Sequence, residues 1–76
     1  MYIAVVFYDE SFNCFKTKPY TYTTNLPLEA GMVVSAPVKN RKTGTVENKK
    51  ALIVGVNMPE PPFECAQITS LWTEEV

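Results

Sequence analysis

The sequence has no histidine and only two cysteines among its 76 residues. Cys14 and Cys65 are far apart and lie outside any Cys-x-x-Cys spacing, so the ligand clusters that build zinc sites are absent. Without histidine, and with most carboxylates in expected turns or near the last residues, no combination of nucleophile, base and oxyanion stabiliser is visible. We therefore expect a protein that is not an enzyme and that uses no metal or other cofactor.

Glycine is also scarce, and long apolar runs are missing. The three glycines form no Gly-x-x-x-x-Gly-Lys phosphate loop, which removes support for nucleotide binding. No run approaches the roughly 18 apolar residues of a membrane span, and the first residues lack a basic, apolar leader. Both cysteines have apolar or aromatic neighbours, which favours two buried, reduced thiols over a disulfide. These features predict a cytoplasmic protein without a membrane partner.

The residues that are present predict one all-β domain over 1–76. At this length folding buries only about 60–65% of the chain's surface, so a single apolar cluster must form the core. No segment longer than eight residues has the i, i+3, i+4, i+7 apolar spacing of a helix. We expect a small, mainly antiparallel barrel of the SH3 or OB type, with five strands near residues 2–8, 14–24, 32–38, 46–58 and 65–72.

Alternation of side chains predicts which residues of these strands face the core. In the third strand the expected inward residues are Met32, Val34, Ala36 and Val38, and in the fourth they are Leu52, Val54, Val56 and Met58. Val34, Val54 and Ile68 should then be buried together. A Val54→Asp substitution would bury an unpaired charge and is expected to unfold the domain.

Turn residues and prolines set further expectations. Gly31, at the end of a Leu-Glu-Ala-Gly turn, should have positive φ or a close neighbour, and Pro37 should end the ladder or mark a sheet edge. Phe12 is expected to plug one end of the core, with an exposed contact as the alternative. Pro59-Glu60-Pro61-Pro62 should be a stiff, extended connection, and the tail 73–76 should be frayed.

The charge is concentrated in one segment, although the net charge of the chain is only −1. Residues 39–50 contain five basic residues against Glu47, a balance of +4, and the remainder has a balance of −5. The composition predicts a hairpin arm with Thr43-Gly44 at its tip. This arm is either a solvated loop or a phosphate-binding element. Its basic residues are Lys39, Arg41, Lys42, Lys49 and Lys50.

Two tyrosines share a face of the second expected strand. Tyr20 and Tyr22 alternate with threonines, so both rings should project to the same side. Rings in this spacing can stack on unpaired bases or on a peptide. The alternative is that they cover an apolar end of the barrel and keep their hydroxyl groups in water.

Five elements follow one another in a recognisable order: a strand with tyrosines, a Leu-x-x-Gly turn, a strand ending in proline, a basic loop and a valine-rich strand with glycine. The residues that define this order are Tyr20, Tyr22, Leu28-Glu29-Ala30-Gly31, Val33-Val34-Ser35-Ala36-Pro37 and Ile53-Val54-Gly55-Val56. The order resembles the N-terminal DNA-binding domain of the bacterial primosomal helicase PriA. The resemblance covers roughly residues 2–56 and implies a small β-barrel that captures the 3′ end of a DNA strand. A free-standing chain of this size resembles the small accessory proteins that bacteriophages encode.

Two functions remain open from the sequence. The first is a non-catalytic module that binds single-stranded or 3′-ended nucleic acid, with the basic hairpin contacting phosphates and the tyrosine face contacting bases. The alternative is a protein-binding barrel, such as a phage-encoded modulator or inhibitor of a host enzyme, which docks by a strand edge or its acidic surface. The partner is therefore nucleic acid or a host protein.

Overall fold

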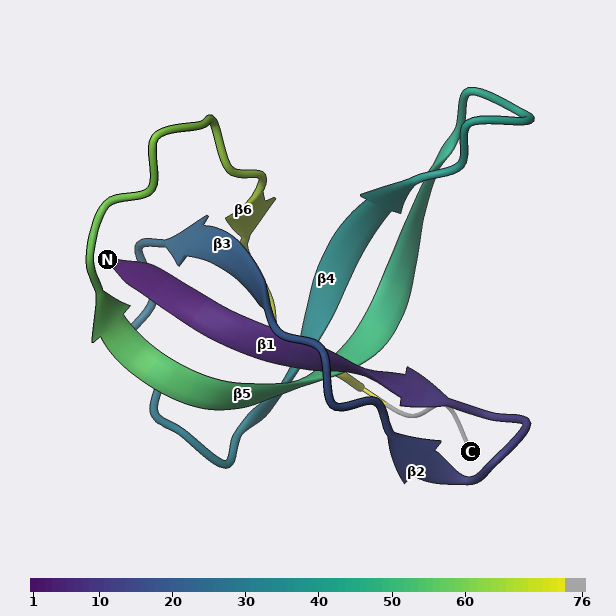
Figure 1. The fold of residues 1–76 in the computed structure, drawn as a ribbon, viewed down its shortest axis with the longest axis horizontal. Coiled ribbons are helices and arrows are strands. Elements are labelled where there is room, and N and C mark those ends of the chain that lie inside the picture. Colours follow the sequence, from purple (N-terminus) through teal and green to yellow (C-terminus); the bar gives the residue numbers. More distant parts are fainter. Residues whose placement is uncertain (74–76) are drawn as a thin grey trace.

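The computed structural model describes residues 1–73, and these residues form an all-β fold without helices. The main sheet has the order β4-β5-β1-β3-β6, and β2 pairs with β1 outside this path. The sheet curves into a nearly closed barrel, which confirms the predicted fold class (Figure 1). The strands are β1 (Tyr2–Asp9), β2 (Cys14–Phe15), β3 (Tyr20–Thr24), β4 (Val33–Lys39), β5 (Val46–Met58) and β6 (Gln67–Ile68).

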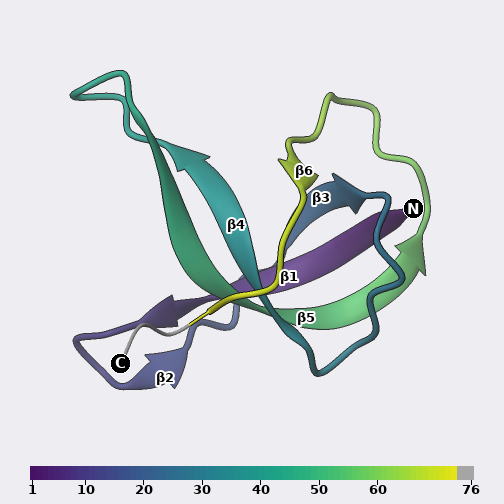
Figure 2. The ribbon, with the colours of Figure 1, turned by 180° about the vertical axis from the view of Figure 1, so that it is seen from behind.

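The barrel is closed by β6 and the residues that follow it. β6 pairs with β3 in parallel, whereas all other paired strands are antiparallel. Beyond β6, the Ser35 N–H donates to the Ser70 carbonyl (3.2 Å) and the Trp72 N–H donates to the Val33 carbonyl (3.0 Å). Segment 66–72 therefore connects β3 to β4, and Figure 2 shows it running between these strands.

Two predicted strands are shorter than expected. The segment 14–24 divides into β2 and β3. The Lys16 N–H still donates to the Phe7 carbonyl (2.7 Å), but residues 17–19 leave the ladder, and Pro19 has no N–H to donate. Only Gln67 and Ile68 of the segment 65–72 form a strand, although Leu71 makes an isolated bridge to Val34. The predicted fraying of the tail concerns residues that, from Glu74 onward, lie outside the described part of the chain.

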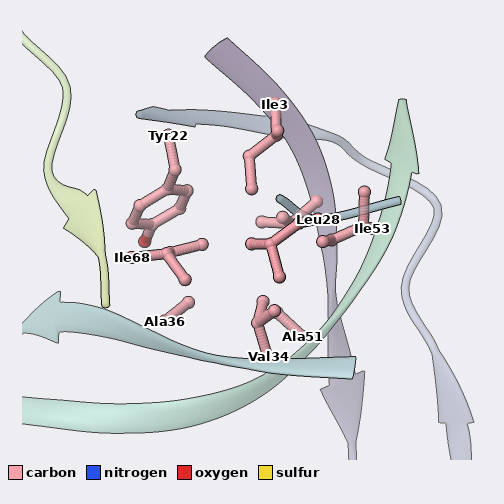
Figure 3. Packing of buried hydrophobic residues seen from close by; sticks show 9 residues of the cluster. Ile3, Tyr22, Leu28, Val34, Ala36, Ala51, Ile53 and Ile68 are labelled. Carbon is pink, nitrogen blue, oxygen red and sulfur yellow. The ribbon is translucent and has the colours of Figure 1, made fainter. Parts of the chain in front are cut away.

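The core is one cluster that draws on every strand except β2. Val34 and Ile68 are fully buried as predicted, and Ile68 lies beside the Tyr22 ring in Figure 3. Leu28, from the turn before β4, is also buried. The cluster consists of Ile3, Val5, Tyr22, Leu28, Val34, Ala36, Ala51, Ile53 and Ile68.

The predicted inward face of β5 is wrong. Ile53 is 1% exposed, whereas Val54 is 49% exposed. The cause is a β-bulge. Val5 opposes Ile53 and Ala4 opposes Gly55, so Val54 is an extra residue without a partner on β1. Because of this extra residue, odd-numbered side chains face the core before the bulge and even-numbered side chains face it afterwards. Beyond the bulge, Val56 packs against the core as predicted. Met58, which follows a second irregularity, is 40% exposed.

Two local predictions are also wrong, and so is the first of the two expectations for Pro37. Phe12 is 77% exposed and does not plug the core, because it lies in the β1–β2 turn beyond the end of the barrel. Cys14 is exposed and Cys65 is half-buried, so neither thiol is in the core, although both are free. Pro37 does not end the ladder, since β4 continues to pair with β5 as far as Lys39.

β4 is a sheet edge whose backbone groups are largely occupied. Val33 and Ser35 direct backbone groups toward segment 70–72, as the two hydrogen bonds above show. Two residues further, Pro37 has no N–H, and its carbonyl accepts a hydrogen bond from Tyr22 Oη (2.9 Å). The bonded Ser35 N–H and the absence of an N–H at Pro37 leave fewer donors for pairing with other chains along this edge. The alternative expectation for Pro37, that it marks an edge, is confirmed.

Candidate nucleic-acid interface

The basic segment forms the predicted hairpin arm. β4 and β5 remain paired up to Lys39 opposite Val46, and the loop between them closes with hydrogen bonds from Asn40 N to Thr45 O and from Gly44 N to Asn40 O, both 2.8 Å. Gly44 has a φ of 73°, which a side chain would disfavour, and it lies at the tip as expected. The arm extends away from the barrel (Figure 1), so its tip is solvated on all sides.

The five basic side chains are distributed over the tip and both faces of the arm. Cross-strand pairs share a face, so Lys39 lies with Val46 and Lys50 lies with Ser35 on one face. Lys49 lies on the other face, where it shares the strand with Glu47. Arg41 and Lys42 occupy the tip and are exposed. The face with Lys39 and Lys50 thus continues the positive charge of the tip toward the barrel without an acid.

That positive face leads into a cleft at the base of the arm. The cleft has a volume of about 960 Å³ and lies between the arm, the β1–β2 hairpin and the residues after Leu71. Lys50 Nζ lies 4.8 Å from the centroid of the Tyr8 ring, which also packs edge-on against Phe15. The residues that line the cleft are Tyr8, Asp9, Glu10, Lys16, Asn48, Lys49, Lys50, Trp72 and Thr73.

Tyr20 and Tyr22 point to the same side, but only Tyr20 is accessible. Tyr22 is 8% exposed, lies in the core cluster, and donates to the Pro37 carbonyl. Tyr20 is 44% exposed and contacts the Phe7 ring edge-on, with 5.4 Å between centroids. Lys18 Nζ lies 5.5 Å from the Tyr20 centroid. Tyr22 thus offers no free ring face, whereas Tyr20 offers part of one.

The structure brings Tyr20 close to the arm without placing it on the positive face. The Phe7 ring contacts Tyr20, and Phe7 opposes Ala51 at the base of the arm. Tyr20, opposite Val5, faces the core side of the sheet, which Lys49 shares. Lys39 and Lys50 face the other side. The aromatic side chain near Lys50 is Tyr8. This pairing was not predictable from the sequence, because the register of β1 against β5 brings the two residues together.

The buried position of Tyr22 should be visible as a pH dependence of stability. Burial, and secondarily the neighbouring Tyr20, raise the pKa of Tyr22 above 10.0. The neutral phenol is therefore favoured in the folded state, so its contribution is complete below pH 10.0 and is lost as the pH rises through the folded pKa. We expect Tyr22→Phe to lower the free energy of unfolding by about 0.5–1.5 kcal/mol at neutral pH, through the lost hydrogen bond.

Urea denaturation of both proteins, at neutral pH and above the ordinary pKa of tyrosine, measures this effect. The stability difference between parent and Tyr22→Phe should shrink at alkaline pH, because ionisation removes the same hydrogen bond from the parent. Other groups titrate in both proteins and cancel. A difference that is constant with pH would contradict this assignment.

Between residues 1 and 73, His, Cys, Asp and Glu side chains form no group of three or more that could hold a metal ion. In the same range no helix has the length and apolar character needed to cross a membrane. The sequence matches no protein-family model, and neither the curated proteins nor the solved structures yield a significant match.

Proposed function

We propose that this protein is a non-catalytic module that binds single-stranded or 3′-ended nucleic acid through the β4–β5 arm. The observation that carries the proposal is the projecting arm, in which five cations and one carboxylate occupy residues 39–50. Phosphate groups attract such a concentration of charge and release counterions when they bind it. The resemblance to the N-terminal domain of the primosomal helicase favours the same class of ligand.

The distribution of charge favours a single strand over a long duplex. Outside the arm, the described residues include two basic and five acidic side chains, a balance of −3, so a duplex lying across the barrel would meet repulsion. A flexible strand can instead follow the arm and expose its bases to nearby rings. Tyr20 is the accessible ring of the predicted pair, and Tyr22 supports the barrel beneath it. The contact surface in this proposal therefore includes Tyr20 and omits Tyr22.

Fluorescence anisotropy with a labelled single-stranded oligonucleotide tests the proposal directly. Binding should be detectable at low salt, and the logarithm of the association constant should fall linearly with the logarithm of salt concentration. A duplex of the same length should bind more weakly. The absence of detectable binding by the parent protein at low salt would overturn the proposal.

Substitutions at Tyr20 test the role of its ring. Tyr20→Leu keeps an apolar side chain but removes the flat π-surface, so affinity for the single strand should fall by about 1–3 kcal/mol if one base stacks there. Tyr20→Phe is the matched control, since it retains the ring and should retain most of the affinity. Anisotropy titrations of the three proteins at one salt concentration make the comparison. Equal affinities for the leucine and phenylalanine variants would exclude stacking on this residue.

A further inference from the structure

A part of the β3 backbone faces outward without a neighbouring strand. Met1 and Thr24 exchange two hydrogen bonds, 3.1 and 2.9 Å long, so they form a hydrogen-bonded pair of the β1–β3 ladder. Along an antiparallel ladder such pairs alternate with non-hydrogen-bonded pairs. Thr23, opposite Tyr2, and Thr21, opposite Ala4, therefore belong to non-hydrogen-bonded pairs. Their N–H and C=O groups therefore point away from β1. The Thr23 N–H accordingly donates to the Ala66 carbonyl (3.0 Å).

Thr21 has no corresponding partner. The pairing of β3 with β6 begins only at Thr23, and within residues 1–73 no other backbone group pairs with the outward groups of Thr21. Segment 63–66 diverges from β3 at this point, and Figure 1 shows the chain between β5 and β6 curving outward. A hollow of about 320 Å³ lies between β3 and this segment. We call it the edge hollow; it is lined by Pro19, Tyr20, Thr21, Tyr22, Phe63, Glu64, Cys65 and Ala66.

The lining of the edge hollow includes two exposed rings and one acidic residue. Phe63 is 60% exposed and Tyr20 is 44% exposed, so both rings offer apolar surface to a ligand. Glu64 is the charged lining residue, and Lys18, which is outside the lining, has its Nζ 5.5 Å from the centroid of the Tyr20 ring. The site therefore combines a free backbone donor and acceptor with apolar surface, an acidic residue in the lining and a basic residue beside it.

We propose that the edge hollow binds an extended peptide segment of a partner protein by strand addition to β3. The outward N–H and C=O of Thr21 have the spacing and direction that a neighbouring strand requires. They can therefore form two hydrogen bonds with an extended peptide. The residue next to the paired one directs its side chain to the Tyr20 face, since side chains alternate. An aromatic or branched apolar side chain fits there, and an acidic residue within two positions of it complements Lys18. This proposal does not rest on nucleic-acid binding by the arm, although Tyr20 belongs to both proposed surfaces.

The substitution Thr21→Pro tests whether the outward backbone N–H of Thr21 binds the peptide. Proline removes the outward N–H but leaves the β1–β3 ladder intact, because Thr21 belongs to a non-hydrogen-bonded pair. The variant should therefore fold, with a melting temperature close to that of the parent. Thr23→Pro is the structural control: it removes the N–H that bonds to Ala66 and should lower the melting temperature clearly.

Selection from a displayed library of random octapeptides, with the parent as bait and Thr21→Pro as counter-bait, provides the probe. The enriched peptides should share an apolar residue with a nearby acidic residue, and one of them is then synthesised. Its affinity should fall at least tenfold with folded Thr21→Pro. N-methylation of the peptide's paired residue should have the same effect, whereas neutralising the arm should leave affinity unchanged.

Three experimental results would contradict the peptide-binding proposal. The proposal is overturned if no sequence is enriched, or if the enriched peptide binds parent and folded Thr21→Pro equally. It is also overturned if the parent instead self-associates through this edge, which sedimentation of the parent and the variant would reveal. Loss of oligonucleotide binding in the arm variant, with peptide binding retained, separates this site from the arm.

Discussion

Replacing Ile53 by Asp should unfold the protein, whereas the same substitution at Val54 should leave it folded. Ile53 is 1% exposed and lies in the core cluster, so a carboxylate there would be buried without a partner. Such a charge costs several kcal/mol, against a total stability of about 5–15 kcal/mol for a typical domain. Val54 is 49% exposed at the bulge, where a carboxylate can stay hydrated. We expect a change of about 1 kcal/mol or less there.

Thermal and urea denaturation, followed by circular dichroism, measure both variants under one set of conditions. The two residues are adjacent and differ by one methylene group, and both variants gain one carboxylate. A difference in their stability therefore reports which of the two side chains faces the core. A Val54→Asp protein that is unfolded while Ile53→Asp is folded would restore the alternation predicted from the sequence and would contradict the bulge.

Removing four charges from the arm should have the second large effect. Lys39, Arg41, Lys42 and Lys49 are exposed, so replacing them by alanine should change stability little. Lys50 is retained because it packs on Tyr8. If all four cations contact phosphates of a single strand, the slope of log affinity against log salt should become less steep by about 3. Affinity near 0.1 M salt should then fall by about 10²–10³-fold.

A charge-restored variant provides the control. The four substitutions lower the net charge from −1 to −5, and changing Glu10, Glu29, Glu60 and Glu64 to glutamine in the same protein returns it to −1. Affinity should remain low if the arm itself is the contact, because net charge alone does not position phosphates. Recovery of parental affinity, or an unchanged salt slope in the first variant, would show that the arm is not the binding element.

The fold class was predictable because its signals are local. The β-branched runs in β1, β4 and β5 and the scarcity of helical spacing predict strands whatever their partners. The inward face of β5 was not predictable, since the bulge at Val54 depends on how the strand pairs with Ala4 and Val5. The shortness of β6 was not predictable either, because it also depends on pairing with distant strands. Most of segment 65–72 contacts β3 and β4 without forming regular ladders.

The candidate site was also predictable only in part from the sequence. The arm was predictable because five basic residues and a glycine tip are close in the sequence. The exposure of Tyr20 and the burial of Tyr22 were not. Alternation places both on one face, and Tyr22 is covered by residues distant in the sequence, Pro37 of β4 and Ile68 of β6 (Figure 3). The free edge at Thr21 depends on where segment 63–66 leaves β3, which no local pattern encodes.

The closing segment 66–72 also determines when the barrel can be completed during synthesis. Phe7 and its β5 partner Ala51 are 44 residues apart, so the central pairs form only after most of the chain has been made. Folding that depends on distant contacts is slow. Until segment 66–72 leaves the ribosome, β3 and β4 both present open edges that neighbouring nascent chains could pair with. We therefore expect the chain to be more prone to aggregation before this segment arrives than after the barrel is closed.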